Sequence, residues 1–206
     1  PGTEYAKAFP EQQPVDGTRI PKLADLVDLV KKSGNTKVGV NCETKVSPHE
    51  PGATAPPEEF ARTAIAEIRR AGMGRRTMVQ SFDWRTLQVI QKEAPEIRTT
   101  YLSTPRTLAP AGSGQPSPWL AGFAPDLLQP GASVPKAVHA AGGKIWAPNQ
   151  SFLTPALLAE ARALGITVIP WTVNDPPTIV KLLDMGVDGI ISDRPDLVQI
   201  ELRKRR

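Results

Sequence analysis

The sequence predicts an α/β fold in which βα units follow one another around a parallel sheet. Short runs of β-branched residues alternate with amphipathic helices, and six such units follow in sequence. This alternation is typical of parallel sheets, because a helix usually provides the crossover between parallel strands. The 206 residues suffice for one domain, or for about three quarters of a (β/α)₈ barrel of ~250 residues. From the pattern alone an open doubly wound sheet is an alternative, and both folds bind ligands at the carboxyl ends of the strands.

The strands are predicted from short runs rich in valine, isoleucine and threonine that turn residues interrupt. The segment before them, to about Ile20, is irregular. Parallel strands are buried on both faces, which accounts for the nearly continuous apolar character of several runs. The predicted strands cover residues 38–43, 77–82, 98–102, 143–147, 166–173 and 187–192.

The helices are predicted from apolar residues at spacings of three and four and from the residues at their ends. Proline, aspartate or threonine opens each helix, since these residues suit the cap or the first turn. The predicted starts are Pro21, Pro57, Asp83, Thr154, Asp175 and Pro195, and glycines follow three of the helices at Gly72, Gly165 and Gly186.

A long connection, residues 104–136, follows the third predicted strand and is rich in proline, glycine and serine. Loops of this length are uncommon in barrels unless they have a function. Because it follows the carboxyl end of a strand, we expect it at the ligand-binding face, either as a lid or pocket wall or as an insertion packed on the rim. Its large apolar residues are Trp119, Leu120, Phe123, Leu127 and Leu128.

Charge and composition exclude several classes of function. The net charge of +4 comes from 25 basic and 21 acidic residues, and the last four residues, 203–206, supply all of it. A nucleic-acid-binding protein would carry basic residues over a whole face, so no nucleic-acid partner is expected. No apolar run approaches the ~18 residues of a membrane span. The single cysteine, Cys42, excludes an intrachain disulfide.

The first strand carries the most informative polar residues. Side chains alternate across a strand, so Asn41, Glu43 and Lys45 share one face, while Cys42 and Thr44 share the other. The polar face is expected to point into the barrel, near the carboxyl end of the strand. There a carboxylate suits a hard divalent cation, and an ammonium suits a phosphate. The alternative is a structural ion pair between Glu43 and Lys45 at the rim.

Other chemistry-bearing residues give weaker signals. His49 follows the first strand and lies near the expected face, but a surface role in the loop is the preferred interpretation. His139 precedes a strand and is expected on the opposite face. Cys42 faces the helices, where a small buried hydrophobe is expected. Trp171, near the end of the fifth strand, either plugs the barrel or contacts a ligand.

Several segments together resemble the glycerophosphodiester phosphodiesterase family. Ile169–Asp175 (IPWTVND) and Leu182–Pro195 (LLDMGVDGIISDRP) are similar to its C-terminal signature. Asn41–Lys45 is similar to its metal-ligand strand, which ends in Glu-x-Lys. Gln80–Asp83 resembles the end of its next strand, and Gly17–Pro21 followed by Leu23 resembles the approach to its third strand. The resemblance covers essentially the whole chain as one domain, residues 1–206, and implies a (β/α)₈ TIM barrel with about six of its eight βα units.

The resemblance implies an activity and a set of site residues. The activity is hydrolysis of glycerophosphodiesters, a small-molecule substrate, to glycerol 3-phosphate and an alcohol with Ca²⁺ or Mg²⁺. Glu43 would bind the metal, and Lys45 would hold a phosphate oxygen and serve in catalysis. A periplasmic or secreted location is expected in preference to a cytoplasmic one. Trp171 would border the glycerol or alcohol side of the substrate. The further substrate-binding candidates are the strand-end residues Gln80, Ser81, Tyr101 and Trp146, for each of which packing is the alternative role.

The chain departs from the family at its catalytic residues. The family opens with a strand that ends in His-Arg-Gly, followed by Glu-x-Asp and His-Asp, and this sequence contains none of them. Two acid/base histidines and two of three metal-binding carboxylates are therefore absent. We expect the chain alone to be inactive. The alternative function is a non-catalytic barrel fragment or degenerate relative that binds phosphodiesters or a protein partner.

Overall fold

The computed structural model describes residues 3–7, 10–108, 116–123 and 131–205. The chain divides into two compact units, Pro1–Thr36 and Lys37–Arg206. In the first unit, α1 (Glu4–Lys7) precedes α2 (Leu23–Lys32). The backbone N–H of Lys22 donates to the Asp25 carboxylate at 2.8 Å, so the helix predicted from residue 21 begins with a satisfied donor.

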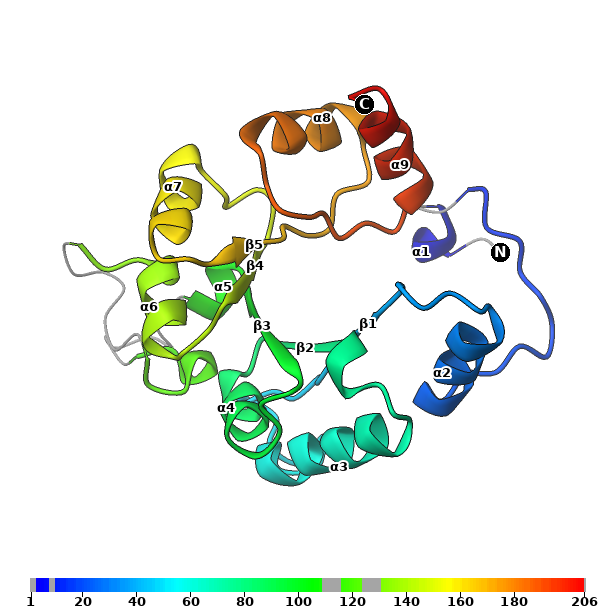
Figure 1. Cartoon of the computed structure of the whole chain (residues 1–206), viewed down its shortest axis with the longest axis horizontal. Helices are drawn as coiled ribbons and strands as arrows, with labels where there is room; N and C mark the ends of the chain where they lie inside the picture. The colour runs from blue at the N-terminus through cyan, green and yellow to red at the C-terminus, as the bar shows by residue number, and fades with distance from the viewer. Residues whose placement is uncertain (1–2, 8–9, 109–115, 124–130, 206) are drawn as a thin grey trace. The chain divides into compact units, whose positions relative to one another are not determined.

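The second unit contains a parallel sheet of five strands in sequence order, β1 to β5. The strands form the inner part of this unit, and α3, α4, α6, α7 and α8 lie along their outer side (Figure 1). The sheet and its alternating helices confirm the predicted α/β class. The strands are β1 (Val40–Glu43), β2 (Thr77–Ser81), β3 (Arg98–Ser103), β4 (Ile145–Pro148) and β5 (Thr167–Val168).

Most helices of the second unit begin where the sequence predicts. Asp83 caps α4 by accepting the N–H of Arg85 at 3.1 Å, and Asp175 caps α8 by accepting that of Thr178 at 2.9 Å. None of the helices in the described part of the chain is long and apolar enough to span a membrane. The helices are α3 (Pro57–Arg70), η1 (Gly74–Arg76), α4 (Trp84–Glu93), α5 (Pro105–Leu108), η2 (Pro118–Leu120), α6 (Val134–Ala140), α7 (Pro155–Ala163), α8 (Pro176–Met185) and α9 (Pro195–Arg203).

The prediction of a sixth strand at residues 187–192 is wrong, because this segment does not form a regular strand. The N–H of Asp188 donates to the carbonyl of Val168, and that of Ile191 donates to Pro170, both at 3.0 Å, so the segment does lie beside β5. The ladder is nevertheless irregular, because the N–H of Val168 donates to the Asp188 carboxylate at 2.7 Å and Pro170 has no N–H. For the same reason β5 covers only Thr167–Val168 of the predicted 166–173.

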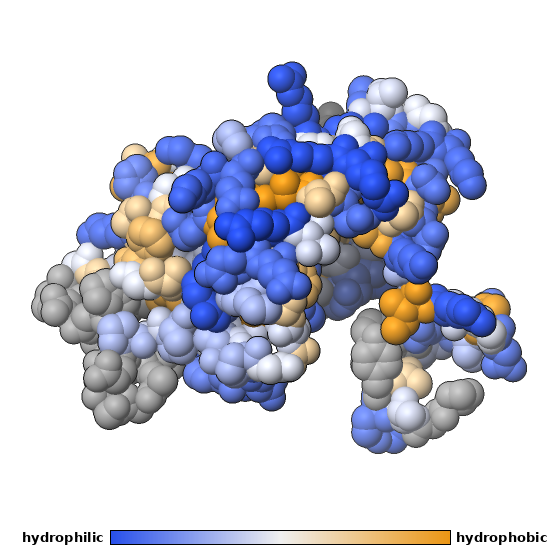
Figure 2. Space-filling view, turned by 90° about the horizontal axis from the view of Figure 1, so that it is seen from below, coloured by the Kyte–Doolittle hydropathy of each residue, from blue (hydrophilic) through white to orange (hydrophobic). Residues whose placement is uncertain are grey.

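The core lies between the sheet and its helices. Tyr101 of β3, Trp146 of β4 and Trp84 of α4 are fully buried there. Gly143 is required by this packing, because a Cβ at that position would lie 2.7 Å from the Tyr101 ring and 2.6 Å from Val138. Outside the core, the face of the molecule shown in Figure 2 is largely hydrophilic, with small hydrophobic groups between polar residues.

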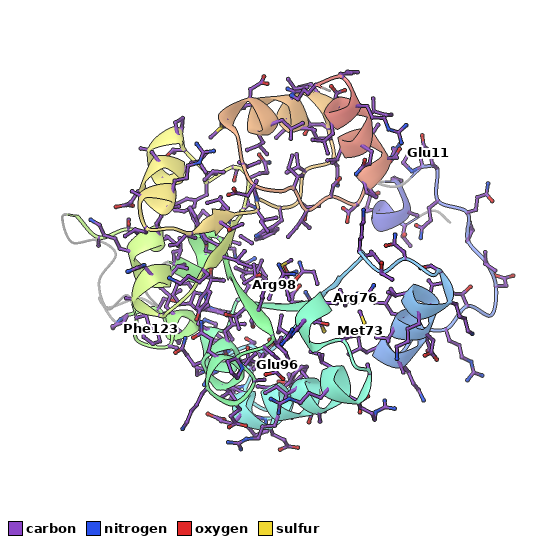
Figure 3. The ribbon with its side chains drawn as sticks, viewed as in Figure 1. Glu11, Met73, Arg76, Glu96, Arg98 and Phe123 are labelled. Carbon is purple, nitrogen blue, oxygen red and sulfur yellow. The ribbon has the colours of Figure 1, made fainter. Side chains whose placement is uncertain are left out.

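Ion pairs join neighbouring helices and loops on the outer surface of this unit. Glu96 lies in the connection between α4 and β3 (Figure 3), and the guanidinium of Arg69 in α3 donates to its carboxylate at 2.7 Å. Arg62, also in α3, pairs with Glu93 of α4. These pairs lower the pKa of both carboxyls through hydrogen bonds to arginine. Because they are largely exposed, their net stabilisation is small.

Candidate functional site

The carboxyl ends of β1 and β2 bring three polar side chains together on the inner face of the sheet. Glu43 is in register with Gln80, and the amide of Asn41 donates to the Gln80 side-chain oxygen at 2.8 Å. On the opposite face the Thr44 hydroxyl bonds to Thr86 of α4 at 2.8 Å. The alternation predicted for the first strand is therefore confirmed: Thr44 faces the helices, and Asn41 and Glu43 point the other way.

Glu43 and Lys45 form an ion pair, with the Lys45 ammonium 2.8 Å from a Glu43 carboxylate oxygen. The Glu43 side chain is 23% exposed and the Lys45 side chain 79% exposed. Such an exposed pair contributes little to stability, so the fold alone does not account for it. Its chemistry is that of one anionic oxygen ligand next to one mobile cation, which suits a metal and a phosphate oxygen respectively.

Ser81 lies one residue beyond Gln80 and faces the helices. Its hydroxyl donates to the carbonyl of Thr44 at 2.8 Å and accepts the N–H of Asp83 at 3.2 Å. The side chain is fully buried. Ser81 therefore fixes the backbone between Glu43 and Lys45. Its hydroxyl is used in these contacts and does not face an open binding surface.

Tyr101 and Trp146 occupy the same row of the sheet as Ser81, since β2, β3 and β4 pair in that register. The Tyr101 hydroxyl donates to the carbonyl of Ala141 at 3.1 Å, and the Trp146 indole donates to Ser103 at 2.8 Å. Burial raises the pKa of Tyr101. The structure supplies a packing role for both rings and does not bring them to the Glu43 side of the sheet. These contacts agree with packing, the alternative role expected for both residues from the sequence.

Aromatic rings line the inner side of the same sheet end and form a continuous cluster. Phe82 follows Gln80 on the inner face, and its ring centroid lies 5.4 Å from Trp171 and 6.5 Å from Trp119. Trp119 also contacts His49, with ring centroids 5.7 Å apart. The structure therefore joins Trp171, a predicted site residue, to Phe82, to Trp119 of the long connection, and to His49, for which a surface role was preferred. We call Phe82, Trp119, Trp171 and His49 the aromatic wall.

Both tryptophan N–H groups of the aromatic wall are satisfied within the protein. Trp119 donates to Nε2 of His49 at 3.2 Å, and Trp171 donates to the carbonyl of Ala147 at 2.8 Å. The contact uses the Nε2 lone pair of His49 as its acceptor. Phe82 could have been identified from its position, because it directly follows β2 on the same face as Gln80. No local signal identifies the contact between Trp119 and His49.

Cys42 in β1 and the pair Asn174–Asp193 beyond β5 have structural roles near the same sheet end. Burial, with a smaller contribution from Glu43, raises the pKa of the Cys42 thiol, so this cysteine stays protonated and is no nucleophile. Beyond β5, the Asn174 side chain donates to the Asp193 carboxylate at 2.9 Å and accepts the N–H of Asp193 at 2.9 Å. These bonds hold the Trp171 segment against residues 192–194.

A complete metal site is not present in the described ranges, 3–7, 10–108, 116–123 and 131–205. Within them no three histidine, cysteine, aspartate or glutamate side chains cluster closely enough to hold an ion. Glu43 supplies one suitable oxygen ligand. The residues described here therefore fit part of a divalent-cation site, and the other ligands would have to come from elsewhere.

A concavity lies at the opposite, amino-terminal ends of the strands. Its volume is about 630 Å³, and Arg98, Lys144 and Thr167, which lie at or beside the starts of β3, β4 and β5, contribute to its lining. Ends of helices α4, α6 and α7 also surround it, so basic side chains there suit the negative ends of helix dipoles. Ligand binding in parallel α/β folds occurs at the other end, where the aromatic wall lies.

Known proteins resemble this chain over nearly its whole length. It is 24% identical over 188 residues to the glycerophosphodiester phosphodiesterase of Caldanaerobacter subterraneus subsp. tengcongensis, covering 91% of this chain and 64% of that protein. It is 23% identical over 201 residues to the glycerophosphodiester phosphodiesterase of Bacillus subtilis (strain 168), covering 95% of this chain and 59% of that protein.

Solved structures give the same result. The chain matches a crystal structure from Silicibacter pomeroyi DSS-3, named after the glycerophosphoryl diester phosphodiesterases, with 34% identity and a TM-score of 0.81. The match covers 98% of this chain and 63% of that one. A phosphodiesterase of Oleispira antarctica, solved with the product sn-glycerol-3-phosphate, shares the fold with a TM-score of 0.63 at 19% identity.

The chain spans less than two thirds of the length of each of these relatives. Its five-stranded parallel sheet and alternating helices are part of the family's TIM barrel, as the resemblance implied. The sequence pattern of the glycerophosphoryl diester phosphodiesterase family matches residues 3–197. This protein chain belongs to the glycerophosphoryl diester phosphodiesterase family.

Proposed function

We propose that this chain supplies one side of the active site of an enzyme that hydrolyses glycerophosphodiesters to glycerol 3-phosphate and an alcohol. The observation that carries the proposal is the Glu43–Lys45 pair on the inner face, at the carboxyl end of β1. Family membership over residues 3–197 supports the reaction type. The position agrees with the rule that barrel enzymes place catalytic residues at the carboxyl ends of their strands.

Each residue of this side has a specific part in the proposed reaction. Glu43 would be one ligand of a divalent cation, Ca²⁺ or Mg²⁺, which polarises phosphoryl oxygens when bound. Lys45, whose side chain is largely exposed, would exchange its Glu43 partner for a phosphate oxygen. Gln80 is in register with Glu43 and accepts a hydrogen bond from Asn41. Its side-chain amide would contact the substrate. Trp171 would border the organic part of the substrate.

Proton transfer requires groups that the described residues do not provide near this pair. The histidine closest to it in sequence is His49, whose Nε2 already accepts a hydrogen bond from Trp119. General acid and base catalysis each contribute ~10²–10⁴-fold. We therefore expect the 206-residue chain to have no measurable phosphodiesterase activity by itself.

The test compares this chain with a version extended by barrel strands that carry His-Arg-Gly and Glu-x-Asp. Hydrolysis of glycerophosphocholine is followed with added Ca²⁺ or Mg²⁺, and a chelator serves as the control. Metal-dependent activity in the extended protein alone is the expected result. Full activity in the short chain would contradict the assigned roles, because it would need an acid and a base from the residues present.

A non-catalytic role is the second candidate, and the incomplete set of metal ligands in the described residues favours it. In that case the chain binds phosphodiesters without turnover. Calorimetric titration with glycerol 3-phosphate separates the two functions when combined with the activity assay. Binding by both proteins without turnover in either would replace the enzymatic proposal with the binding one.

A further inference from the structure

Thr44 lies between Glu43 and Lys45 and is bonded through its N–H, its carbonyl and its hydroxyl. The N–H donates to the carbonyl of Gln80 at 3.0 Å, and the carbonyl accepts the Ser81 hydroxyl at 2.8 Å. The residue is only 1% exposed. A buried residue whose polar groups are all bonded has little freedom to rotate, so the backbone that carries Glu43 and Lys45 is fixed at this point.

The hydroxyl of Thr44 reaches helix α4. It lies 2.8 Å from the hydroxyl of Thr86, which donates to the carbonyl of Asp83 at 3.0 Å. A threonine hydroxyl has a single proton, so Thr44 is the donor in the contact between the two threonines. Thr86 and Asp83 are fully buried. The two hydroxyls, which we call the hydroxyl pair, therefore connect the end of β1 to the first turn of α4.

Helix α4 is anchored in the core, so Thr86 is a fixed reference point for Thr44. The Trp84 indole donates to the carbonyl of Leu102 in β3 at 3.2 Å. The Trp84 ring also packs edge-on against Tyr101, with centroids 4.8 Å apart. Leu87, which directly follows Thr86, is fully buried. The first turn of α4 cannot shift without disturbing these contacts.

The Glu43–Lys45 pair has less support of its own. The Lys45 side chain is 79% exposed and the Glu43 side chain 23% exposed, and the two are joined by their mutual ion pair at 2.8 Å. Exposed ion pairs hold their side chains weakly. In an active site, a displacement of about 1 Å can lower the rate about 10²-fold. The direction of both side chains therefore depends on the backbone of Thr44, and through the hydroxyl pair on α4.

We propose that the hydroxyl pair positions the Glu43–Lys45 pair for the reaction, with Thr86 as a positioning residue that acts through Thr44 and does not touch the substrate. The inference rests on the proposed function for its effect on turnover, whereas the connection between α4 and β1 is independent of any activity. A purely structural role would be different. In that case the two hydroxyls only satisfy each other in the core, and removing both together would leave turnover unchanged.

A double-mutant cycle separates positioning from core stability. Thr86→Val keeps the branched shape but leaves the buried Thr44 hydroxyl without an acceptor, so the melting temperature should fall by about 5 °C. Thr44→Val combined with Thr86→Val removes both hydroxyls and should recover most of this loss, because neither is left unsatisfied. The Asp83 carbonyl still accepts the N–H of residue 86, at 3.3 Å.

Turnover of the extended protein should follow position and not stability. In Thr86→Val, kcat for glycerophosphocholine should fall about 10-fold with little change in KM, because Lys45 is expected to act on transition-state charge. The double variant should stay equally slow although its melting temperature recovers. Thr86→Ser keeps the hydroxyl and should keep kcat. A double variant that recovers both melting temperature and kcat would overturn the proposal.

Thr63→Val is the matched control for these variants. Thr63 is an exposed residue of α3 whose hydroxyl donates to the carbonyl of Glu59 at 2.9 Å, so the change also removes a helical threonine hydroxyl bonded to a carbonyl. Its kcat and melting temperature should equal those of the unchanged protein. An equal fall of kcat in Thr63→Val and Thr86→Val would overturn the assignment to the hydroxyl pair.

Amide hydrogen exchange tests the connection in the 206-residue chain without any activity. The N–H of Thr44 is bonded to the carbonyl of Gln80, so its exchange reports local opening at the end of β1. In the double variant this amide should exchange about 10-fold faster, while the amides of β3 keep their rates. Unchanged exchange at residue 44 would overturn the proposal.

The outcomes separate this inference from the proposed function. Faster exchange at residue 44, in a protein whose extended form hydrolyses no glycerophosphodiester, would support the connection to α4 and refute the enzymatic function. Metal-dependent hydrolysis by the extended protein, with normal kcat in both Thr86→Val and the double variant, would support the function and overturn the inference.

Discussion

The two faces of the sheet differ in what their side chains do. On the helix-facing side, Ser81, Tyr101 and Trp146 form one row, are fully buried and have all their polar atoms bonded to neighbours. On the inner side, Gln80 is half-buried and Asn41 is exposed, and Glu43 pairs with a lysine that is 79% exposed. Gln80 and Ser81 are consecutive residues of β2, so one step along the strand leads from the inner side to the helix-facing side.

This difference separates stability from chemistry. A change on the helix-facing side removes packing or leaves a buried group without a partner, so it should lower the free energy of unfolding. A change on the inner side removes an exposed or half-exposed polar group, so it should alter binding or turnover with little effect on stability. Five substitutions test this division, in order of decreasing expected effect.

Trp146→Ala should have the largest effect. The indole is fully buried, and its N–H donates to Ser103. Removing a buried aromatic side chain costs about 3–5 kcal/mol, and the Ser103 hydroxyl also loses its partner. Urea denaturation followed by circular dichroism measures the loss. Gln80→Ala on the inner face is the control, and an equal loss in both variants would break the comparison.

Lys45→Met and Glu43→Gln should affect function in the active, extended protein. Lys45→Met keeps most of the volume and removes the cation, so turnover should fall about 10²-fold, as when one group that stabilises the transition state is lost. Glu43→Gln should weaken metal affinity, and added metal should partly restore turnover. Melting temperatures are measured on the same samples. Unchanged kinetics with a large fall in melting temperature would favour a purely structural ion pair.

Ser81→Ala should lower stability by about 1–3 kcal/mol, because the buried carbonyl of Thr44 and N–H of Asp83 lose a hydrogen-bond partner. In the extended protein it should also lower turnover, since Thr44 lies between Glu43 and Lys45. Ser151→Ala, at an exposed position, is the matched control. A normal melting temperature in Ser81→Ala would show that these bonds are dispensable.

Tyr101→Phe should have the smallest effect near neutral pH, about 1 kcal/mol, because Gln88 also donates to the carbonyl of Ala141. Burial raises the pKa of Tyr101 above its ordinary value of about 10. The folded state therefore holds this proton more tightly than the unfolded state, so stability falls as the pH rises above about 10. Melting temperatures between pH 8 and 11 should show a steeper alkaline decline in the unchanged chain than in Tyr101→Phe.

The sequence predicts what depends on local periodicity. The alternation in β1 placed Thr44 toward α4 and Glu43 on the opposite face, because side chains in a strand alternate strictly. Aspartate and threonine caps located the starts of α4, α7 and α8 for an equally local reason. The direction of Tyr101 and Trp146 was not available in this way, since it depends on the register of β3 and β4 with β2.

Contacts between distant segments could not be predicted from the pattern. Trp119 and His49 are 70 residues apart, and nothing in either segment identifies the other as its partner. The irregular ladder of residues 187–192 also depends on a non-local event, the bond between the Asp188 carboxylate and the N–H of Val168. Leu127 and Leu128, expected in the wall of the long connection, lie outside the described residues.

The turn around Trp119 has a consequence for how its ring responds to sequence change. Ser117 and Leu120 are buried on both sides of Trp119, and the Ser117 hydroxyl donates to the carbonyl of Thr107. The position of the ring therefore depends on a few short-range contacts. Exchange of Ser117 should shift the ring away from His49, whereas exchange of Trp119 itself leaves the buried side chains between the sheet and its helices in place.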